Sequence, residues 1–204
     1  MTGDPAAAAL AGGVALLERA IGYTLGSLNL VTSEALTRPT PCAGWDLATL
    51  LDHMDDSLAA LSESAIPGHV SLTPPAPPDA GPAPATLQVV PAVVGSLRTR
   101  ACGLLGAWAA AQQGHAVSIG DCSLDAVIVA SVGAIEVAVH GWDIARACGQ
   151  LRPIPPRIAE ELLDLAPLFI TSADRPHRFA SPPPLPPHPT PSDHLLTYLG
   201  RTPH

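Results

Sequence analysis

The sequence contains no lysine, and its ten basic residues are all arginines. The 18 acidic residues outnumber them and give a formal net charge of −8 at pH 7. The arginines also form no cluster along the chain. Because binding to nucleic-acid phosphates requires a concentrated basic surface, we expect no nucleic-acid partner.

Charged and aromatic residues are scarce, at 14% and 3%, whereas 47% of the residues are hydrophobic. With so few aromatic rings, the core must be built mainly from leucine, valine, alanine and isoleucine. A length of 204 residues suits one domain of ordinary size with an irregular tail.

A targeting signal is not recognisable in the first residues, MTGDPAAAALAGG, which hold an acid and no basic region. The longest apolar run, residues 124–145, is interrupted by charged or ionisable side chains, so we expect no membrane span. The four cysteines are widely spread and include no CxxC pair. We therefore expect reduced thiols and a cytoplasmic protein.

Apolar residues recur at three- and four-residue steps in several long segments, which is typical of amphipathic helices. Asp46 and Ser123 suit helix N-caps, Pro5 and Pro156 suit first turns, and Gly149 suits a C-terminal cap. The predicted helices cover residues 5–30, 47–64, 87–113, 123–148 and 157–169, with a short helical turn over 192–200.

Prolines fill residues 67–86 and much of the C-terminal tail, which excludes regular helix or central strand there. Residues 112–122 are predicted to form a loop, and we identify no convincing strand pairs. The pattern indicates an all-α fold, an antiparallel four-helix bundle with a Pro-rich loop and tail. We expect residues 1–175 to form the bundle and residues 176–204 to form a Pro-rich tail that packs on it.

The helix predicted over residues 123–148 carries ionisable side chains among apolar neighbours. Glu136, His140 and Asp143 are four and three residues apart, so they project from one side of the helix. An isolated charge in such a setting is costly unless it is paired or bound to a metal. Glu136 and His140 are therefore candidate ligands of one metal ion.

A catalytic metal site usually has three protein ligands and an open position. The best candidate for the third ligand is His53, near the middle of the helix predicted over residues 47–64. Two imidazoles and one carboxylate suit zinc, nickel, iron or manganese. Other interpretations stay open: His140 as a core histidine that donates to a carbonyl, His53 as a surface histidine, or Glu136 paired with Arg19, Arg98 or Arg100.

Two segments resemble the DinB-like superfamily and, more narrowly, the metal-binding domain at the N-terminus of mycothiol-dependent maleylpyruvate isomerase. They are TRPTPCAGWDLATLLDHM (37–54) and IEVAVHGWDIARACGQ (135–150), and the closing SDHLLTYLGRTP (192–203) resembles stand-alone actinobacterial members. The resemblance implies a DinB-like four-helix bundle that holds a divalent metal through His53, Glu136 and His140. Zinc is the favoured ion, with nickel, iron or manganese as alternatives.

The resemblance implies a metal-dependent enzyme that acts on a small electrophilic substrate as an S-transferase or isomerase, with mycothiol as its thiol. We expect no second, C-terminal domain and hence a related reaction rather than that particular isomerisation. Alternatives are a thiol-independent cyclase, lyase or hydrolase of a natural-product pathway, or a non-catalytic metal-binding or ligand-binding helical protein.

Asp143 is expected to orient a ligand histidine or, less favoured, to act as a general base. Cys148 lies about 120° around the helix from Glu136, so we do not expect it to be a ligand. Cys42 is expected to have a structural role. The expected partner is a small-molecule substrate. We expect the chain to be a monomer or a homodimer and to have no membrane partner.

Overall fold

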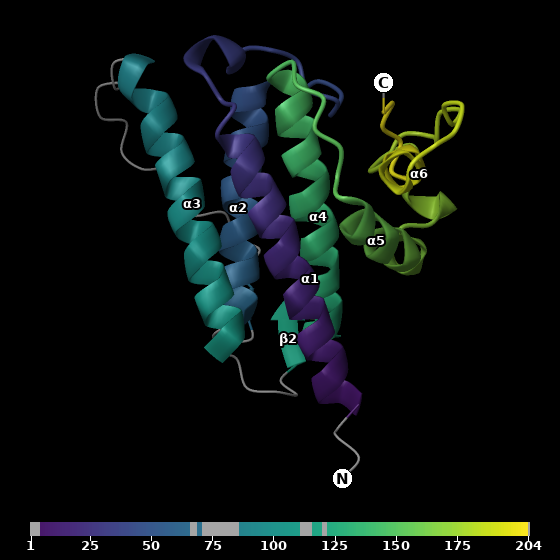
Figure 1. The fold of residues 1–204 in the computed structure, drawn as a ribbon. Helices are drawn as coiled ribbons and strands as arrows, with labels where there is room; N and C mark the ends of the chain where they lie inside the picture. The colour runs from purple at the N-terminus through teal and green to yellow at the C-terminus, as the bar shows by residue number, and fades with distance from the viewer. Residues whose placement is uncertain (1–4, 66–68, 71–85, 111–115, 120–121, 204) are drawn as a thin grey trace.

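The computed structural model describes residues 5–65, 69–70, 86–110, 116–119 and 122–203. Helices dominate this part of the chain (Figure 1). The helices and 3-10 turns are α1 (Pro5–Leu28), η1 (Ser33–Ala35), α2 (Leu47–Ala65), α3 (Thr86–Ala110), α4 (Ala126–Ala147), α5 (Pro156–Phe169), η2 (Ser172–Asp174) and α6 (Pro191–Tyr198). The strands are β1 (His69–Val70), β2 (Ala116–Ile119) and β3 (Cys122–Asp125).

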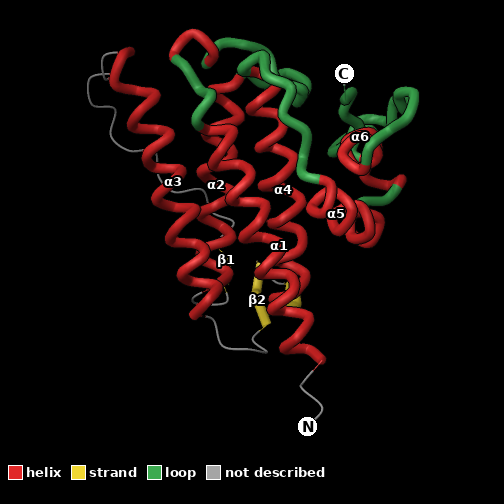
Figure 2. Tube along the Cα trace, in the orientation of Figure 1, coloured by secondary structure: helices red, strands yellow, loops and turns green. Residues whose placement is uncertain are grey.

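The four long helices α1 to α4 lie side by side and form a bundle, as Figures 1 and 2 show. Helix α4 lies beside α1 and runs in the same direction, because Gly13 of α1 lies against Ala130 and Thr24 lies against Gly141. Figure 2 also shows that α5 and α6 lie together on one side of this bundle.

Helices α2 and α3 likewise run in one direction, opposite to that of α1 and α4. Arg100 of α3 pairs with Asp55 of α2, and Trp108 donates a hydrogen bond to the carbonyl of Leu61. Leu61 also packs against Gly133, near the start of α4. The bundle therefore consists of two parallel pairs that are set antiparallel to each other.

The predicted all-α class is confirmed, but the neighbouring helices are not all antiparallel. The physical reason is the length of one connection: residues 66–85, between the parallel helices α2 and α3, are numerous enough to span the length of the bundle before α3 starts. Most of the Pro-rich segment over 67–86 lies outside the described residues.

Two local predictions are wrong. Within residues 112–122, predicted as a loop, β2 pairs antiparallel with β3 and parallel with β1. Ser123 belongs to β3 and does not cap α4, which starts at Ala126 after Asp125. The dipeptide Gly120-Asp121 is typical of two-residue hairpin connections and was the sequence signal for this strand pair.

Several helix ends are confirmed. The Asp46 carboxylate accepts a hydrogen bond from the backbone N–H of Thr49, as an N-cap does. Gly149 has φ +76°, and the N–H of Gln150 reaches the carbonyl of Ala145 after the end of α4. Pro156 opens α5, and Pro167 lies inside that helix.

Helix α4 is the central element of the core, and its polar residues Ser131, His140 and Asp143 are buried with most of its apolar ones. By length and hydropathy alone, α4 and α1 are the two described helices that would suffice to cross a membrane. In α4, however, 78% of the relevant window is buried inside the protein, against 33% in α1. The apolar composition of α4 is therefore accounted for by its central position in the bundle.

Close contact between α1 and α4 depends on Gly141. A Cβ atom there would contact the Thr24 Oγ1 atom and lie 3.1 Å from the Thr24 Cα atom, so backbone as well as side chain would have to move. Thr24 in turn donates a hydrogen bond of 2.7 Å to the carbonyl of Val137. This contact fixes α4 against α1 directly beside His140.

We predict that Gly141→Ala lowers the free energy of unfolding by about 1–3 kcal/mol, because the added methyl group overpacks the α1–α4 contact. The control is Gly22→Ala on α1, where a Cβ atom meets nothing within 4 Å. That substitution is expected to stabilise the helix by roughly 0.5–1 kcal/mol. Urea denaturation followed by circular dichroism measures both, and equal effects of the two substitutions would contradict the close approach.

Candidate metal centre

The loop before α2 forms one wall of the site and is held by its own hydrogen bonds. The N–H of Thr40 donates to the carbonyl of Trp45 over 2.9 Å, and the Thr40 hydroxyl donates to the same carbonyl over 3.0 Å. Gly44 has φ +82°, a left-handed conformation that glycine adopts without strain. The tight turn places the Trp45 ring edge-on to the His53 ring, with their centroids 4.9 Å apart.

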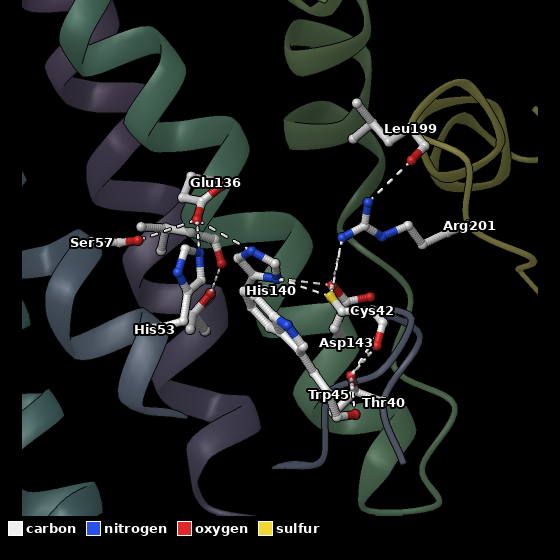
Figure 3. Close-up of polar contacts among 12 residues, drawn as sticks. Thr40, Cys42, Trp45, His53, Ser57, Glu136, His140, Asp143, Leu199 and Arg201 are labelled. Carbon is white, nitrogen blue, oxygen red and sulfur yellow. Dashed lines mark hydrogen bonds and ion pairs between the residues drawn. The ribbon is translucent and has the colours of Figure 1, made fainter. Parts of the chain in front are cut away.

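His53 from α2 and Glu136 and His140 from α4 come together next to this loop (Figure 3). The Nε2 atom of His53 lies 2.7 Å from Oε1 of Glu136, and the Nε2 atom of His140 lies 3.2 Å from the same oxygen. The three ligand atoms lie within 4.8 Å of one another. The structure thus brings together the three residues that the sequence predicted as ligands.

The arginine alternative for Glu136 is excluded by the partners that the candidate arginines have. Each of them contacts another residue: Arg19 pairs with Glu161, Arg98 with Asn29 and Arg100 with Asp55. Besides the two histidines, the Glu136 carboxylate accepts a hydrogen bond of 3.2 Å from the hydroxyl of Ser57.

The site is open on one side and closed on the other. The side chains of His53 and Glu136 are each 35% exposed, whereas that of His140 is 8% exposed. Burial raises the pKa of Glu136, but the hydrogen bonds and charges of His140 and His53 outweigh it and hold that pKa well below its ordinary value. Glu136 is therefore a carboxylate at neutral pH and a charged candidate ligand.

His140 is held on its inner side by Asp143. The Nδ1 atom of His140 lies 2.9 Å from Oδ2 of Asp143, whose side chain is 0% exposed. Burial lowers the pKa of His140, but the hydrogen bonds with Asp143, Cys42 and Glu136 outweigh it and raise that pKa well above its ordinary value. Because a carboxylate only accepts hydrogen bonds, Nδ1 is protonated towards Asp143, and without a metal the raised pKa keeps a proton on Nε2 towards Glu136, which a metal ion would displace.

A second group of potential ligands, Cys42 with His140 and Asp143, is occupied by a cation from the protein itself. The Arg201 guanidinium lies 3.0 Å from Oδ2 of Asp143 and 3.4 Å from the sulfur of Cys42. The Cys42 thiol donates to the same carboxylate oxygen over 3.3 Å. The guanidinium supplies the positive charge that a metal would supply, so this group is a hydrogen-bonded cluster.

Sequence reasoning missed Ser57, which contacts Glu136, and a residue far along the chain, Arg201. It lies in the closing segment LGRTP, which the sequence analysis used only as a point of resemblance. The cysteines whose side chains the structure describes, Cys42, Cys102 and Cys148, form no disulfide with one another. Among these three, Cys42 contacts the site, through the side chains of His140 and Asp143.

The residues present fit a divalent metal ion. Two neutral imidazole nitrogens and one carboxylate oxygen are a common ligand set of catalytic zinc, with bonds of about 2.0–2.2 Å. The three atoms converge from two helices that the bundle holds rigidly, and one ring has the carboxylate support that ligand histidines usually have. Two imidazole nitrogens that face one carboxylate oxygen also need a shared positive charge between them, from protons or from a metal.

Known proteins resemble this chain in sequence and in fold. The family model described as the mycothiol maleylpyruvate isomerase N-terminal domain matches residues 17–145. Uncharacterized proteins from two strains of Mycobacterium tuberculosis are each 27% identical over 189 residues, covering 84% of this chain and 88% of theirs. The crystal structure of the mycothiol-dependent maleylpyruvate isomerase is similar with a TM-score of 0.55 and 18% identity, covering 76% of this chain and 68% of that chain. This likeness confirms the fold.

We predict that the wild-type protein binds one zinc ion per chain and that His140→Ala or Glu136→Gln abolishes this binding, because the two ligands that remain cannot hold the ion alone. The control is His177→Ala, an exposed histidine outside the site. Elemental analysis of protein purified without a metal-affinity tag measures the zinc content. Equal zinc content in His140→Ala and the control would contradict the ligand set.

The raised pKa of His140 predicts how metal affinity depends on pH. Protons and the metal compete for Nε2, so zinc affinity should fall as the pH drops through that raised value. Burial lowers the pKa of His140 and the hydrogen bond with Asp143 raises it, so Asp143→Asn should move the fall to lower pH. Competition with a chromophoric chelator between pH 5 and pH 9 measures this, and an unchanged profile in the variant would contradict it.

Proposed function

Because the chain belongs to the family of the mycothiol maleylpyruvate isomerase N-terminal domain, we propose that it is a metal-dependent enzyme that joins a thiol to a small electrophilic molecule or isomerises it. Mycothiol is the proposed thiol, and His53, Glu136 and His140 are the proposed metal ligands. Zinc is the favoured ion, and nickel, iron and manganese suit the same ligands.

The observation that carries the proposal is the convergence of His53, Glu136 and His140 at a partly exposed position in an otherwise apolar bundle. A structural metal site is closed by four protein ligands, whereas a catalytic site has three and an open position. This site has three candidate ligands, and the side chains of His53 and Glu136 are each 35% exposed. It therefore corresponds to a catalytic site. The exposed side gives a thiol and a substrate access to the site.

A divalent metal bound there would supply a Lewis acid that deprotonates a thiol at neutral pH and polarises a substrate carbonyl. The chain's own residues prepare the site for it. Asp143 holds the His140 ring in one orientation and one tautomer, and Ser57 holds the Glu136 carboxylate. The Trp45 ring packs against the His53 ring and supports its orientation.

Asp143 serves in this proposal as a positioning residue rather than as a general base. Its carboxylate is fully buried, and the oxygen Oδ2 already accepts hydrogen bonds from His140, Arg201 and Cys42. The surrounding hydrogen bonds outweigh the effect of burial, which raises its pKa, and hold that pKa below its ordinary value. A group so occupied, on the side of His140 remote from Glu136, is a poor acceptor of a substrate proton.

The test is adduct formation between mycothiol and a fluorogenic electrophile such as monochlorobimane. We expect the zinc-loaded protein to accelerate it, and His140→Ala or chelation of the metal to reduce the rate by about 100-fold or more. The exposed control His177→Ala should keep the wild-type rate.

Other outcomes identify the alternatives. Metal-dependent turnover of an organic substrate without any thiol would replace the proposal by a cyclase, lyase or hydrolase. Metal binding without turnover of any electrophile in the zinc, nickel, iron and manganese forms would leave a non-catalytic metal-binding protein.

A further inference from the structure

The C-terminal tail contributes a buried cation to the metal centre. Arg201 lies 58 residues from Asp143 in the sequence, and its guanidinium lies 3.0 Å from Oδ2 of that carboxylate. The same oxygen receives the hydrogen bond from Nδ1 of His140 over 2.9 Å. A continuous chain of contacts, visible in Figure 3, therefore runs from Arg201 through Asp143 to His140.

The end of α6 is built to direct Arg201 inward. A capping box between Thr190 and Asp193 starts this helix, and the N–H of Arg201 bonds the carbonyl of Leu196 over 2.8 Å where it ends. Gly200 makes the turn with φ +77°, and a Cβ atom there would lie 2.5 Å from the carbonyl oxygen of Ala180. This backbone conformation and close approach require glycine, so the turn that aims Arg201 is fixed by the sequence.

The pair formed by Arg201 and Asp143 is poorly explained as a device for stability. Their side chains are 12% and 0% exposed, and removing two charges from water offsets most of their attraction. Two buried atoms of the pair, Nε of Arg201 and Oδ1 of Asp143, have no hydrogen-bond partner within the described part of the chain. The contacts concentrate instead on Oδ2, the oxygen that holds His140.

We propose that Arg201 is a positioning residue of the metal centre, which fixes the Asp143 carboxylate so that His140 presents Nε2 to the metal. The inference rests on the proposed metal site, but it concerns residues outside the region that matches the family model, residues 17–145. Arg201 does not touch the metal or the substrate. It acts through Asp143, and docking of the tail is thereby part of metal binding.

A thermodynamic consequence follows from this arrangement. If docking of residues 199–203 strengthens metal binding, then metal binding must strengthen docking of the tail by the same factor. The metal therefore protects the end of the chain, although the tail supplies no ligand.

The experiment measures zinc affinity by chelator competition and the visible spectrum of the cobalt-loaded protein, without thiol or substrate. We expect Arg201→Gln to weaken zinc binding by about 10–100-fold and to change the cobalt absorption bands, as loss of a group that orients a ligand does. Arg201→Lys should restore part of the affinity, because an ammonium can still pair with the carboxylate.

Two controls separate positioning from folding. Arg178→Ala removes an exposed arginine that pairs with Asp174 and should leave affinity and spectrum unchanged. Arg175→Ala removes contacts of 2.5 Å to the carbonyls of Ala180 and Tyr198, which anchor the tail without touching Asp143. It should lower the melting temperature and affect the metal less than Arg201→Gln does.

A double-mutant cycle tests the route of action. In an Asp143→Asn background, Arg201→Gln should have no further effect on zinc affinity, because its partner is already altered. Amide hydrogen exchange of residues 190–203 should slow on zinc binding in the wild type but not in Arg201→Gln.

The outcomes distinguish the two proposals. Wild-type zinc affinity and an unchanged cobalt spectrum in Arg201→Gln would overturn the inference and leave the proposed function standing. Equal losses in Arg201→Gln and Arg175→Ala, in proportion to lost stability, would overturn it as well. A wild-type protein that binds no divalent metal would overturn both.

Discussion

The structure depends most on the compensation of one buried charge, the Asp143 carboxylate. Its side chain is 0% exposed, in a core built almost entirely of aliphatic residues. An isolated carboxylate there would be prohibitively unfavourable, so the fold must bring donors to it. Those donors come from three separate parts of the chain: His140 of the same helix, Cys42 of the loop before α2, and Arg201 of the tail. The loop, the bundle and the tail are thus joined by contacts to one atom, Oδ2 of Asp143.

The second constraint is the close packing of α4, which carries Glu136, His140 and Asp143. Gly133 and Gly141 allow Leu61 of α2 and Thr24 of α1 to approach its backbone more closely than any larger residue would permit. The polar groups of the site consequently lie on a helix that cannot rotate or slide without overpacking on two sides. A chain rich in small residues and poor in aromatic rings is suited to this kind of packing.

The sequence predicted best those features that depend on residues close together in the chain. Helical periodicity located the long helices, and the spacing of Glu136 and His140 predicted their common side, because both signals are local. His53 could be proposed from its place in an amphipathic helix, and the structure brings it to the other two. The direction of α3 and the contact of Arg201 depend on long connections, for which neighbouring residues contain no signal. The β2–β3 pair was local and was missed because its strands are short.

The two histidines of the site differ in freedom, and this difference indicates how the site works. His140 is buried and has a carboxylate beside each ring nitrogen. Asp143 lies next to Nδ1, and Glu136 lies next to Nε2. His53 is 35% exposed, and its described contacts are the Glu136 carboxylate through Nε2 and the edges of the Trp45 and His140 rings. A metal ion at this position would therefore have one fixed and one adjustable imidazole ligand, with the adjustable one on the exposed side. If the coordination of such an ion changed when a substrate binds, the His53 side chain would move, and the His140 side chain would stay fixed against the bundle.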